Sequence, residues 1–112
     1  MNKKQLLEQL ERVQAENSGL TLVNYRAVRY EDGFQYSKTE NGSTNTCTSA
    51  GMALAMIQSF NGTCGVWYDA GLFYVETSYH TEDLYEAYKM AVKYHQKSIY
   101  AWLTDSYLTI GK

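Results

Sequence analysis

Hydrophobic residues recur along the chain with two different spacings, and their alternation predicts three helices and three β-hairpins. Leu6, Leu10 and Val13 follow one another at the spacing of a helix face. Asn2, which precedes them, belongs to the residue types that favour a helix N-terminus. We therefore expect a first helix over residues 2–17, amphipathic and with a narrow apolar stripe.

Two further segments carry helical signals but differ in their polarity. Residues 49–60 follow a capping Thr48 or Ser49 and are apolar on nearly every side, which predicts a buried helix. Residues 81–96 begin at Thr81, a capping residue followed by two acidic residues, and predict an amphipathic helix. The side chains expected to face inward from this third helix are Leu84, Tyr88, Ala91, Val92 and His95.

The remaining apolar segments are rich in β-forming residues and lie on either side of short turn sequences. The predicted strand pairs are 20–30 with 34–37, 64–68 with 72–78, and 98–103 with 106–110. The first pair flanks Asp32-Gly33, and Asp-Gly between such segments is a strong hairpin signal. In the second pair, a two-residue loop would place Trp67 opposite Tyr74, whereas a three-residue loop would shift this pairing by one residue.

Two other features concern the organisation of the chain. Residues 28–36 and 66–74 share the pattern Val-x-Tyr-acid-x-Gly-apolar-x-Tyr, which indicates either a duplicated hairpin or the common chemistry of hairpin turns. Residues 38–47 are dominated by Thr, Asn, Ser and Gly, and this composition predicts a loop.

These elements predict an α+β fold, in which an antiparallel β-sheet of Tyr-rich hairpins carries three α-helices, two of them packed on one face. With 112 residues, the chain is long enough for one domain of ordinary size and too short for two. We therefore expect a single domain over residues 1–112. It would consist of an N-terminal helix (1–19) and a hairpin–helix–hairpin–helix–hairpin body (20–112).

Charge and composition narrow the classes of function. A net charge of -2 argues against direct nucleic-acid binding through bulk charge, because domains that bind this way are usually strongly basic. No apolar run approaches the roughly 20 residues that a bilayer requires, and the first residues lack the apolar centre of a signal peptide. We therefore expect a cytoplasmic protein with no membrane partner and with both cysteines reduced.

Cys47 is the candidate for nucleophilic chemistry because it lies just before a predicted helix N-terminus, where the helix dipole lowers the pKa of a thiol. Residues 47–50, Cys-Thr-Ser-Ala, resemble the nucleophile region of papain-like and bacteriocin-processing cysteine peptidases. The resemblance implies a small hydrolase in which His80 or His95 would be the general base. The aromatic or glycine residues that adjoin such a cysteine are absent, so we favour a cysteine in a plain capping loop.

The sequence contains no motif typical of nucleotide or metal binding. Cys47, Cys64, His80 and His95 are separated by intervals of about fifteen residues, whereas structural zinc requires closely spaced pairs of ligands. We therefore expect no cofactor, no metal and no enzymatic activity.

Two sets of residues are candidates for binding. The first consists of acidic residues at predicted turns and aromatic residues on the flanking strands: Tyr30, Glu31, Asp32, Tyr36, Trp67, Asp69 and Tyr74. The second is a strip on the third helix: Lys89, Lys93 and Lys97, with Tyr85 on the same side. The acidic set suits a basic partner, and the lysine strip suits phosphates. Turn chemistry and an ordinary solvated helix face explain the same residues without any partner.

Residues 66–75, Val-Trp-Tyr-Asp-Ala-Gly-Leu-Phe-Tyr-Val, resemble small accessory proteins of phages and mobile elements of low-GC Gram-positive bacteria, anti-CRISPR proteins among them. Chain length and the Tyr-, Lys- and Asn-rich composition share in this resemblance. It implies a stoichiometric inhibitor that occupies a surface of a host protein, such as a CRISPR nuclease or a similar nucleoprotein. The alternatives are a nucleic-acid-binding regulatory module, a small hydrolase that uses Cys47, and a subunit of a homodimer that pairs edge strands.

Overall fold

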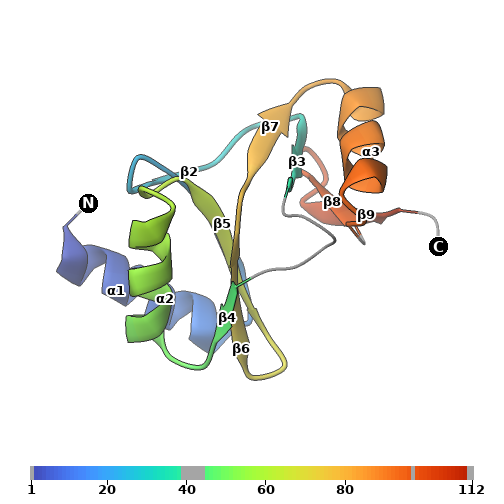
Figure 1. Cartoon of the computed structure of the whole chain (residues 1–112). Helices are drawn as coiled ribbons and strands as arrows, with labels where there is room; N and C mark the ends of the chain where they lie inside the picture. Colours follow the sequence, from blue (N-terminus) through green and yellow to red (C-terminus); the bar gives the residue numbers. More distant parts are fainter. Residues whose placement is uncertain (1, 39–44, 97, 111–112) are drawn as a thin grey trace. The chain divides into compact units, whose positions relative to one another are not determined.

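The computed structural model describes residues 2–38, 45–96 and 98–110 and confirms the predicted α+β class (Figure 1). The chain divides into two compact units, each formed by two separate stretches of sequence. Unit 1 comprises Met1–Val28 and Thr44–Glu76, and unit 2 comprises Arg29–Ser43 and Thr77–Lys112. The strands form two antiparallel sheets, one in each unit, where the sequence predicted one sheet. The expectation of a single domain stays a prediction.

Unit 1 contains the first two helices, and both begin and end close to the predicted residues. Helix α1 (Lys3–Glu16) starts with a reciprocal cap, in which the Asn2 side chain accepts from the Gln5 N–H at 2.8 Å and the Gln5 side chain accepts from the Asn2 N–H at 3.1 Å. It ends at Asn17 in the left-handed conformation. Helix α2 (Ala50–Ser59) is capped by Ser49, one of the two predicted caps.

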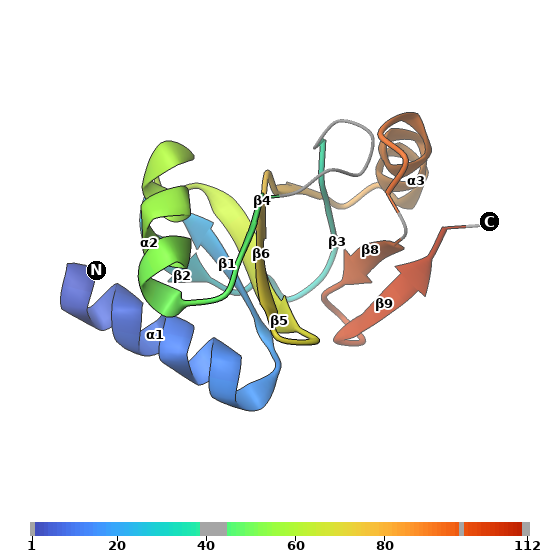
Figure 2. The same cartoon turned by 60° about the horizontal axis from the view of Figure 1, so that its bottom comes forward.

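Five antiparallel strands form the sheet of unit 1, in the order β2-β1-β5-β6-β4. Their bounds are β1 (Gly19–Val23), β2 (Arg26–Val28), β4 (Asn45–Cys47), β5 (Cys64–Asp69) and β6 (Leu72–Glu76). Helices α1 and α2 lie on one face of this sheet (Figure 2). Between helices and sheet lies a core of Leu6, Leu10, Val13, Leu22, Cys47, Ala50, Ala53, Ile57, Cys64, Val66, Phe73 and Val75.

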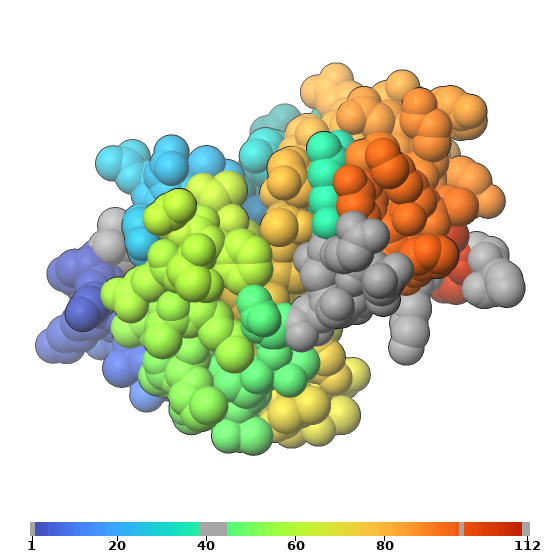
Figure 3. Space-filling model, viewed as in Figure 1, coloured from blue at the N-terminus to red at the C-terminus, as the bar shows by residue number. Residues whose placement is uncertain are grey.

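Helix α2 is buried on one side only, so the prediction of a helix surrounded by protein is wrong. Ala53 and Ile57 are fully buried, whereas Met52 is 52% exposed. The outer side of α2 lies at the surface in Figure 3, where this helix is yellow-green. Gly51 and Ala55 of this helix are exposed and small enough to face water at little cost, which explains why its apolar composition overstated its burial.

The first predicted hairpin is wrong. β1 pairs with β2 and turns at Asn24-Tyr25, both of which have positive φ. The backbone N–H of Tyr25 donates to the Gly62 carbonyl at 2.9 Å, and that of Asn24 donates to Thr63 Oγ1 at 3.0 Å. These two bonds fix the turn against the connection from α2 to β5, and no local sequence signal announces them. Asp32-Gly33 therefore does not close a hairpin.

The second hairpin is confirmed, and the structure selects one of its two possible registers. β5 and β6 are joined by the two-residue loop Ala70-Gly71, whose φ values are 51° and 84°. Trp67 lies opposite Tyr74 and Tyr68 lies opposite Phe73. The sequence echo between residues 28–36 and 66–74 has no structural counterpart, because the first of these segments passes from unit 1 into unit 2 and forms no hairpin.

Unit 2 has a four-stranded antiparallel sheet in the order β7-β3-β8-β9 and a single helix. Its elements are β3 (Phe34–Tyr36), β7 (Tyr79–Thr81), α3 (Leu84–Lys93), β8 (Ser98–Ala101) and β9 (Ser106–Thr109). β8 and β9 form the third predicted hairpin. β3 lies between β7 and β8 and pairs with both. The core of unit 2 is smaller and consists of Tyr36, Ala87, Ala91, Ile99 and Ile110, with Phe34 and Met90 packed against it.

Helix α3 is shorter than predicted and presents a different face to the sheet. Its cap is Asp83, whose carboxylate accepts from the N–H groups of Tyr85 and Glu86, and not Thr81. Ala87 and Ala91 are fully buried. Of the five residues predicted to point inward, only Ala91 does so; the exposed ones are Leu84 (49%), Tyr88 (47%), Val92 (48%) and His95. The small alanines let the helix lie close to the sheet, and the larger side chains remain at its flank.

Candidate functional site

The residues predicted to bind a partner are divided between the two units. Trp67, Asp69 and Tyr74 belong to the β5–β6 hairpin of unit 1. The others that the structure describes belong to unit 2: Tyr30, Glu31, Asp32, Tyr36, Lys89 and Lys93. Lys97 and most of the predicted polar loop, residues 39–44, lie outside the described residues.

In unit 1, Trp67 and Tyr74 form an aromatic pair on the sheet face opposite the helices. Their rings are stacked, with centroids 5.2 Å apart and planes 9° from parallel. Their sequence neighbours Val66 and Phe73 point into the core, so the alternation of the strands directs Trp67 and Tyr74 to the other face. Both rings are partly buried, and Asp69 at the end of β5 is exposed.

Tyr36 is part of the core of unit 2 and does not belong to a surface site, which corrects the sequence prediction. It is 7% exposed, and its hydroxyl donates to a carboxylate oxygen of Glu86 at 3.3 Å. The other oxygen of Glu86 accepts from the Thr81 hydroxyl at 3.2 Å. Burial, and then the negative charge of Glu86, raise the pKa of Tyr36. This network links β3, β7 and α3, and its role is structural.

Tyr30 is held by an aromatic cluster on the sheet of unit 2. Its ring stacks on the His80 imidazole, with centroids 3.8 Å apart and planes 14° from parallel, and meets the edge of Trp102 at 5.6 Å. The indole N–H of Trp102 donates to the Gln35 side chain at 2.9 Å, and the Gln35 amide donates to the Ser78 hydroxyl at 2.8 Å. This chain of hydrogen bonds fixes the surface on which the Tyr30 ring lies.

The same cluster positions Glu31 and Asp32. A ring nitrogen of His80 lies 2.8 Å from the backbone oxygen of Asp32, and the backbone N–H of Trp102 donates to the Gly33 carbonyl at 3.0 Å. Gly33 has a φ of 88°, and a Cβ there would approach the Thr81 carbonyl oxygen to 2.9 Å, so glycine is required. The Asp-Gly signal in the sequence thus marks a tightly packed bend, from which the carboxylates of Glu31 and Asp32 project into solvent.

Further acidic side chains lie at the same end of the unit 2 sheet. Phe34 at the start of β3 pairs with Thr81 at the end of β7, so residues 31–33 and residues 82–83 are neighbours. Glu82 and Asp83 are exposed there, although Asp83 also caps α3. We call this set the acidic end, and it consists of Glu31, Asp32, Glu82 and Asp83, with Tyr30 as its aromatic anchor.

The lysine strip of α3 is present in part. The Lys89 ammonium lies over the Tyr85 ring at 5.5 Å from its centroid, and the Lys93 ammonium lies at the same distance from the Tyr94 ring. Lys93 is in the last turn of the helix, where a cation interacts favourably with the helix dipole. Each described lysine therefore has a local role.

The thiols have the opposite character to that expected for Cys47. Both cysteines are free and buried. Burial raises the pKa of Cys47, although a hydrogen bond with the Ser49 backbone opposes this change, and burial raises the pKa of Cys64 to about 12. Burial thus disfavours the thiolate that the hydrolase alternative requires, whereas the interpretation favoured from the sequence was a cysteine in a plain capping loop. Both histidines of the chain belong to unit 2, so unit 1 alone offers Cys47 no general base.

Within the described ranges, no group of three or more His, Cys, Asp or Glu side chains is arranged to hold a metal ion. None of the described helices is both long enough and apolar enough to span a bilayer.

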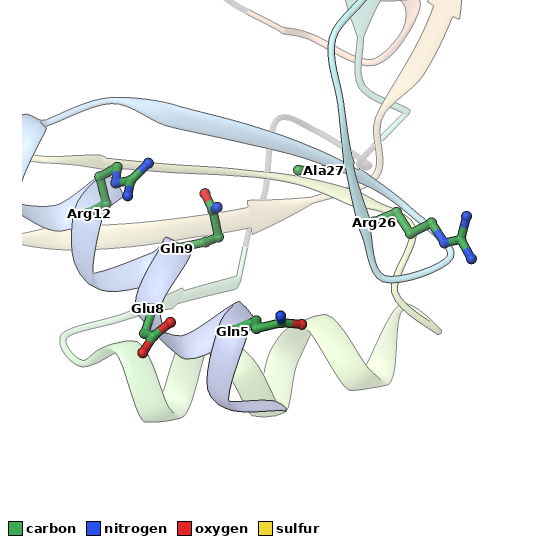
Figure 4. Close-up of a pocket in the computed structure, with 6 residues that line it drawn as sticks. All are labelled: Gln5, Glu8, Gln9, Arg12, Arg26 and Ala27. Carbon is green, nitrogen blue, oxygen red and sulfur yellow. The ribbon is translucent and has the colours of Figure 1, made fainter. Parts of the chain in front are cut away.

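Two surface depressions differ in their chemistry. In unit 1, a hollow of about 510 Å³ between α1 and β2 is lined by Gln5, Glu8, Gln9, Arg12, Arg26 and Ala27. Its arginines do not converge, since Arg12 and Arg26 point in different directions (Figure 4). In unit 2, an open groove of about 640 Å³ between α3 and β9 is lined almost wholly by apolar atoms of Leu84, Tyr85, Tyr88, Ile99, Leu108, Thr109 and Ile110.

The sequence analysis missed this groove, although α3 carried a signal for it. The apolar residues of α3 cover more than half of the helix circumference, from Met90 through Ala87, Ala91, Leu84 and Tyr88 to Val92. One face of a small sheet covers only a narrower stripe of the helix surface than this apolar arc. An apolar arc of such width predicts that one flank of the helix remains exposed.

Comparison of the chain with family models, with curated proteins and with solved structures gives no match. The site must therefore be interpreted from its own geometry.

Proposed function

We propose that this chain is a non-enzymatic protein-binding module that acts as a stoichiometric inhibitor of a host protein, and that its acidic end contacts a basic surface of that protein. A CRISPR nuclease or a similar nucleoprotein fits this proposal, because such proteins bind nucleic acid through Lys- and Arg-rich surfaces. The acidic end would compete with phosphates for such a surface.

The observation that carries the proposal is the fixed position of two exposed carboxylates. Glu31 and Asp32 project from a bend that is held by the stacking of Tyr30 on His80 and by the hydrogen bond between His80 and the Asp32 backbone. Carboxylates on a rigid bend lose little conformational entropy on binding, so more of their attraction to a basic partner appears as affinity. Tyr30, partly exposed, adds a ring of the kind that is enriched at protein interfaces.

The first test is a pull-down with the tagged chain from a lysate of a low-GC Gram-positive host, with and without nuclease treatment. We expect one host protein at near one-to-one stoichiometry, retained after nuclease treatment. The affinity for that purified protein should fall about tenfold in the double variant Glu31→Gln/Asp32→Asn, because two rim charges are lost. It should also fall as the salt concentration rises.

The matched control is Glu8→Gln/Glu11→Gln, which removes the same charge from exposed positions of α1 in unit 1. This variant should keep the affinity of the original chain. Equal losses in both double variants would mean that net charge alone acts, and the absence of loss in either would remove the acidic end from the interface. Recovery of nucleic acid in place of a protein would contradict the proposal as a whole.

A further inference from the structure

Side chains from all four strands of the unit 2 sheet form a row on the face turned away from α3. Tyr36 and Ile99 belong to the core between this sheet and α3, so the alternation of the strands directs their sequence neighbours to the opposite face. The paired positions on that face, from β7 through β3 and β8 to β9, are His80, Gln35, Tyr100 and Tyr107. Strand pairing therefore brings together side chains that lie far apart in the sequence.

Aromatic contacts extend this row into a continuous set of rings. The Tyr100 ring lies 5.2 Å from the Tyr107 ring and 4.9 Å from the Trp102 ring, measured between centroids. Trp102 in turn contacts Tyr30, which stacks on His80. We call these five residues the aromatic row. Trp102 is buried within the row, whereas Tyr30 and Tyr100 are partly exposed. The row therefore offers accessible rings whose positions are fixed by their contacts with one another.

One cation of the chain itself already lies against the aromatic row. The guanidinium carbon of Arg29 is 5.8 Å from the centroid of the Trp102 ring, within the range of a cation–π contact. Arg29 is exposed, so this contact lies at the border between the row and solvent. The rings of the row are thus arranged in a way that accommodates a guanidinium group.

The charges beside the aromatic row also favour a cationic ligand. The exposed carboxylates of Glu31 and Asp32 lie on the bend at one end of the row. Asp105, which is also exposed, lies in the turn that follows Trp102. The backbone hydrogen bond from Trp102 to the Gly33 carbonyl holds this turn against the bend. These negative charges attract a cation and repel the phosphates of a nucleic acid.

We propose that the aromatic row binds an arginine side chain on the basic surface of the partner protein. This inference rests on the proposed function and adds to it the kind of basic residue that is recognised. Arginine and lysine carry the same charge, but a guanidinium is planar, stacks on aromatic rings and is more weakly hydrated than an ammonium. The rings therefore favour arginine, and they make a contact that charge alone would drive selective between the two residues.

The first test compares two short peptides, one in which arginine alternates with glycine and one with lysine in place of arginine. Calorimetric titration of the full chain should show that the arginine peptide binds about fivefold more tightly than the lysine peptide. The position of binding is followed by NMR in Trp67→Phe, which leaves Trp102 as the only tryptophan. Because the Trp102 indole N–H lies within the row and donates to Gln35, its signal should shift as the arginine peptide is added and stop shifting at saturation.

Single substitutions separate the contribution of the rings from that of the charges. Tyr30→Leu and Tyr100→Leu each remove one ring and keep every carboxylate, so each should weaken binding of the arginine peptide about fivefold and reduce its advantage over the lysine peptide. Glu31→Gln/Asp32→Asn should weaken the binding of both peptides. The matched control is Tyr85→Leu, which removes a tyrosine that is 69% exposed on α3, outside the row, and should change neither affinity. Circular dichroism checks the fold of each variant, and Tyr100→Leu leaves the bend at residues 31–33 untouched.

Several results would overturn the inference. These are equal affinities for the two peptides, an undiminished preference for arginine in both Tyr30→Leu and Tyr100→Leu, a Trp102 signal that does not move, and no binding of either peptide. Binding of a uridine oligonucleotide with a shift of the Trp102 signal would also overturn it, by assigning the rings to nucleobases. The proposed function fails separately, when the pull-down recovers no host protein. A recovered protein that Tyr30→Leu and Tyr100→Leu bind as tightly as the original chain would leave the proposed function in place and remove the aromatic row from the interface.

Discussion

The two units share one run of four elements in the same order and differ in how much apolar surface they bury. Strand β4, helix α2 and the hairpin β5–β6 in unit 1 correspond to β7, α3 and β8–β9 in unit 2. The caps Ser49 and Asp83 are 34 residues apart, and so are the helix-ending residues Asn61 and His95, both left-handed with φ of 55° and 57°. The two units differ in the helices that cover each sheet.

Unit 1 has two helices, whereas the described residues of unit 2 form one. α1 packs against α2 and β5, and the core of unit 1 contains twelve buried residues among those described, compared with five in unit 2. Similar capping and turn residues therefore produce similar helices and strands in the two units. The number of helices that cover a sheet determines how much of each helix and strand is buried. In unit 2, the surface that remains exposed is the flank of α3 and the edge of β9.

The strongest way to test this comparison is to damage each core in turn. Phe73→Ala in unit 1 should lower the free energy of unfolding by about 4 kcal/mol, because it empties a fully buried aromatic site. Ile99→Ala in unit 2 should lower it by about 3 kcal/mol, since the side chain is smaller and borders an open groove.

The chain offers one tryptophan in each unit, Trp67 and Trp102, so fluorescence during denaturation can follow each unit separately. Variants with the other tryptophan changed to phenylalanine isolate each signal. A loss below about 1 kcal/mol in Phe73→Ala would contradict the assigned core.

A second test concerns Glu76, which ends β6. Burial raises the pKa of its carboxyl to about 7. The folded state therefore holds a proton that the unfolded state releases near its ordinary pKa, and the stability that this proton provides is lost as pH rises from about 4.5 through 7. We expect a decrease of about 2 kcal/mol over this range, measured by urea denaturation at each pH. Glu76→Gln should abolish this part of the pH dependence, and an unchanged profile in that variant would refute the assignment.

The helix caps allow a matched pair of substitutions. Ser49→Ala should cost about 1 kcal/mol and Asp83→Ala about 1.5 kcal/mol, because Ser49 accepts from one backbone N–H and Asp83 from two. Denaturant midpoints compare the two variants directly. Equal costs would mean that the second hydrogen bond of Asp83, at 3.4 Å, contributes nothing measurable.

The smallest effect is expected at the β5–β6 turn. Ala70 has a positive φ of 51°, a conformation that asparagine adopts more readily than alanine. Ala70→Asn should therefore stabilise the protein by about 0.5 kcal/mol, seen as a slightly higher Tm. A lower Tm would show that the loop does not have this conformation in solution.

Short-range signals accounted for most of what the sequence predicted correctly. Asn2 and the pair Thr48 and Ser49 indicated helix starts, and Asp69-Ala70-Gly71 indicated a hairpin with two possible registers, because each of these structures is determined by a few neighbouring residues. Glu31 and Asp32 are exposed, but the sequence placed them at the tip of a hairpin that the structure does not contain.

The wrong predictions concern features that are determined by residues far away in the sequence. Asp32-Gly33 suggested a hairpin, but His80 and Trp102, far along the chain, make it a packed bend. Tyr36 was predicted to be a surface aromatic, but it is buried in the core of unit 2 and its hydroxyl donates to Glu86 of α3. The inward face of α3 could not be chosen locally, because its apolar arc is wider than the sheet that it covers.

The position of β3 has a consequence for the order in which the protein forms during synthesis. β3 is a central strand of its sheet, yet its partners β7 and β8 follow it by 43 residues or more, as in the pairs Tyr36↔Tyr79 and Phe34↔Ala101. A nascent chain that has emerged as far as Glu76 contains every element of unit 1 but only β3 of unit 2. Chains generally fold from the N-terminus as they emerge, so unit 1 can form while β3 still has no partner strand. Unit 2 is then completed by the last strands to be translated, and ribosomes that stop early leave β3 without partners.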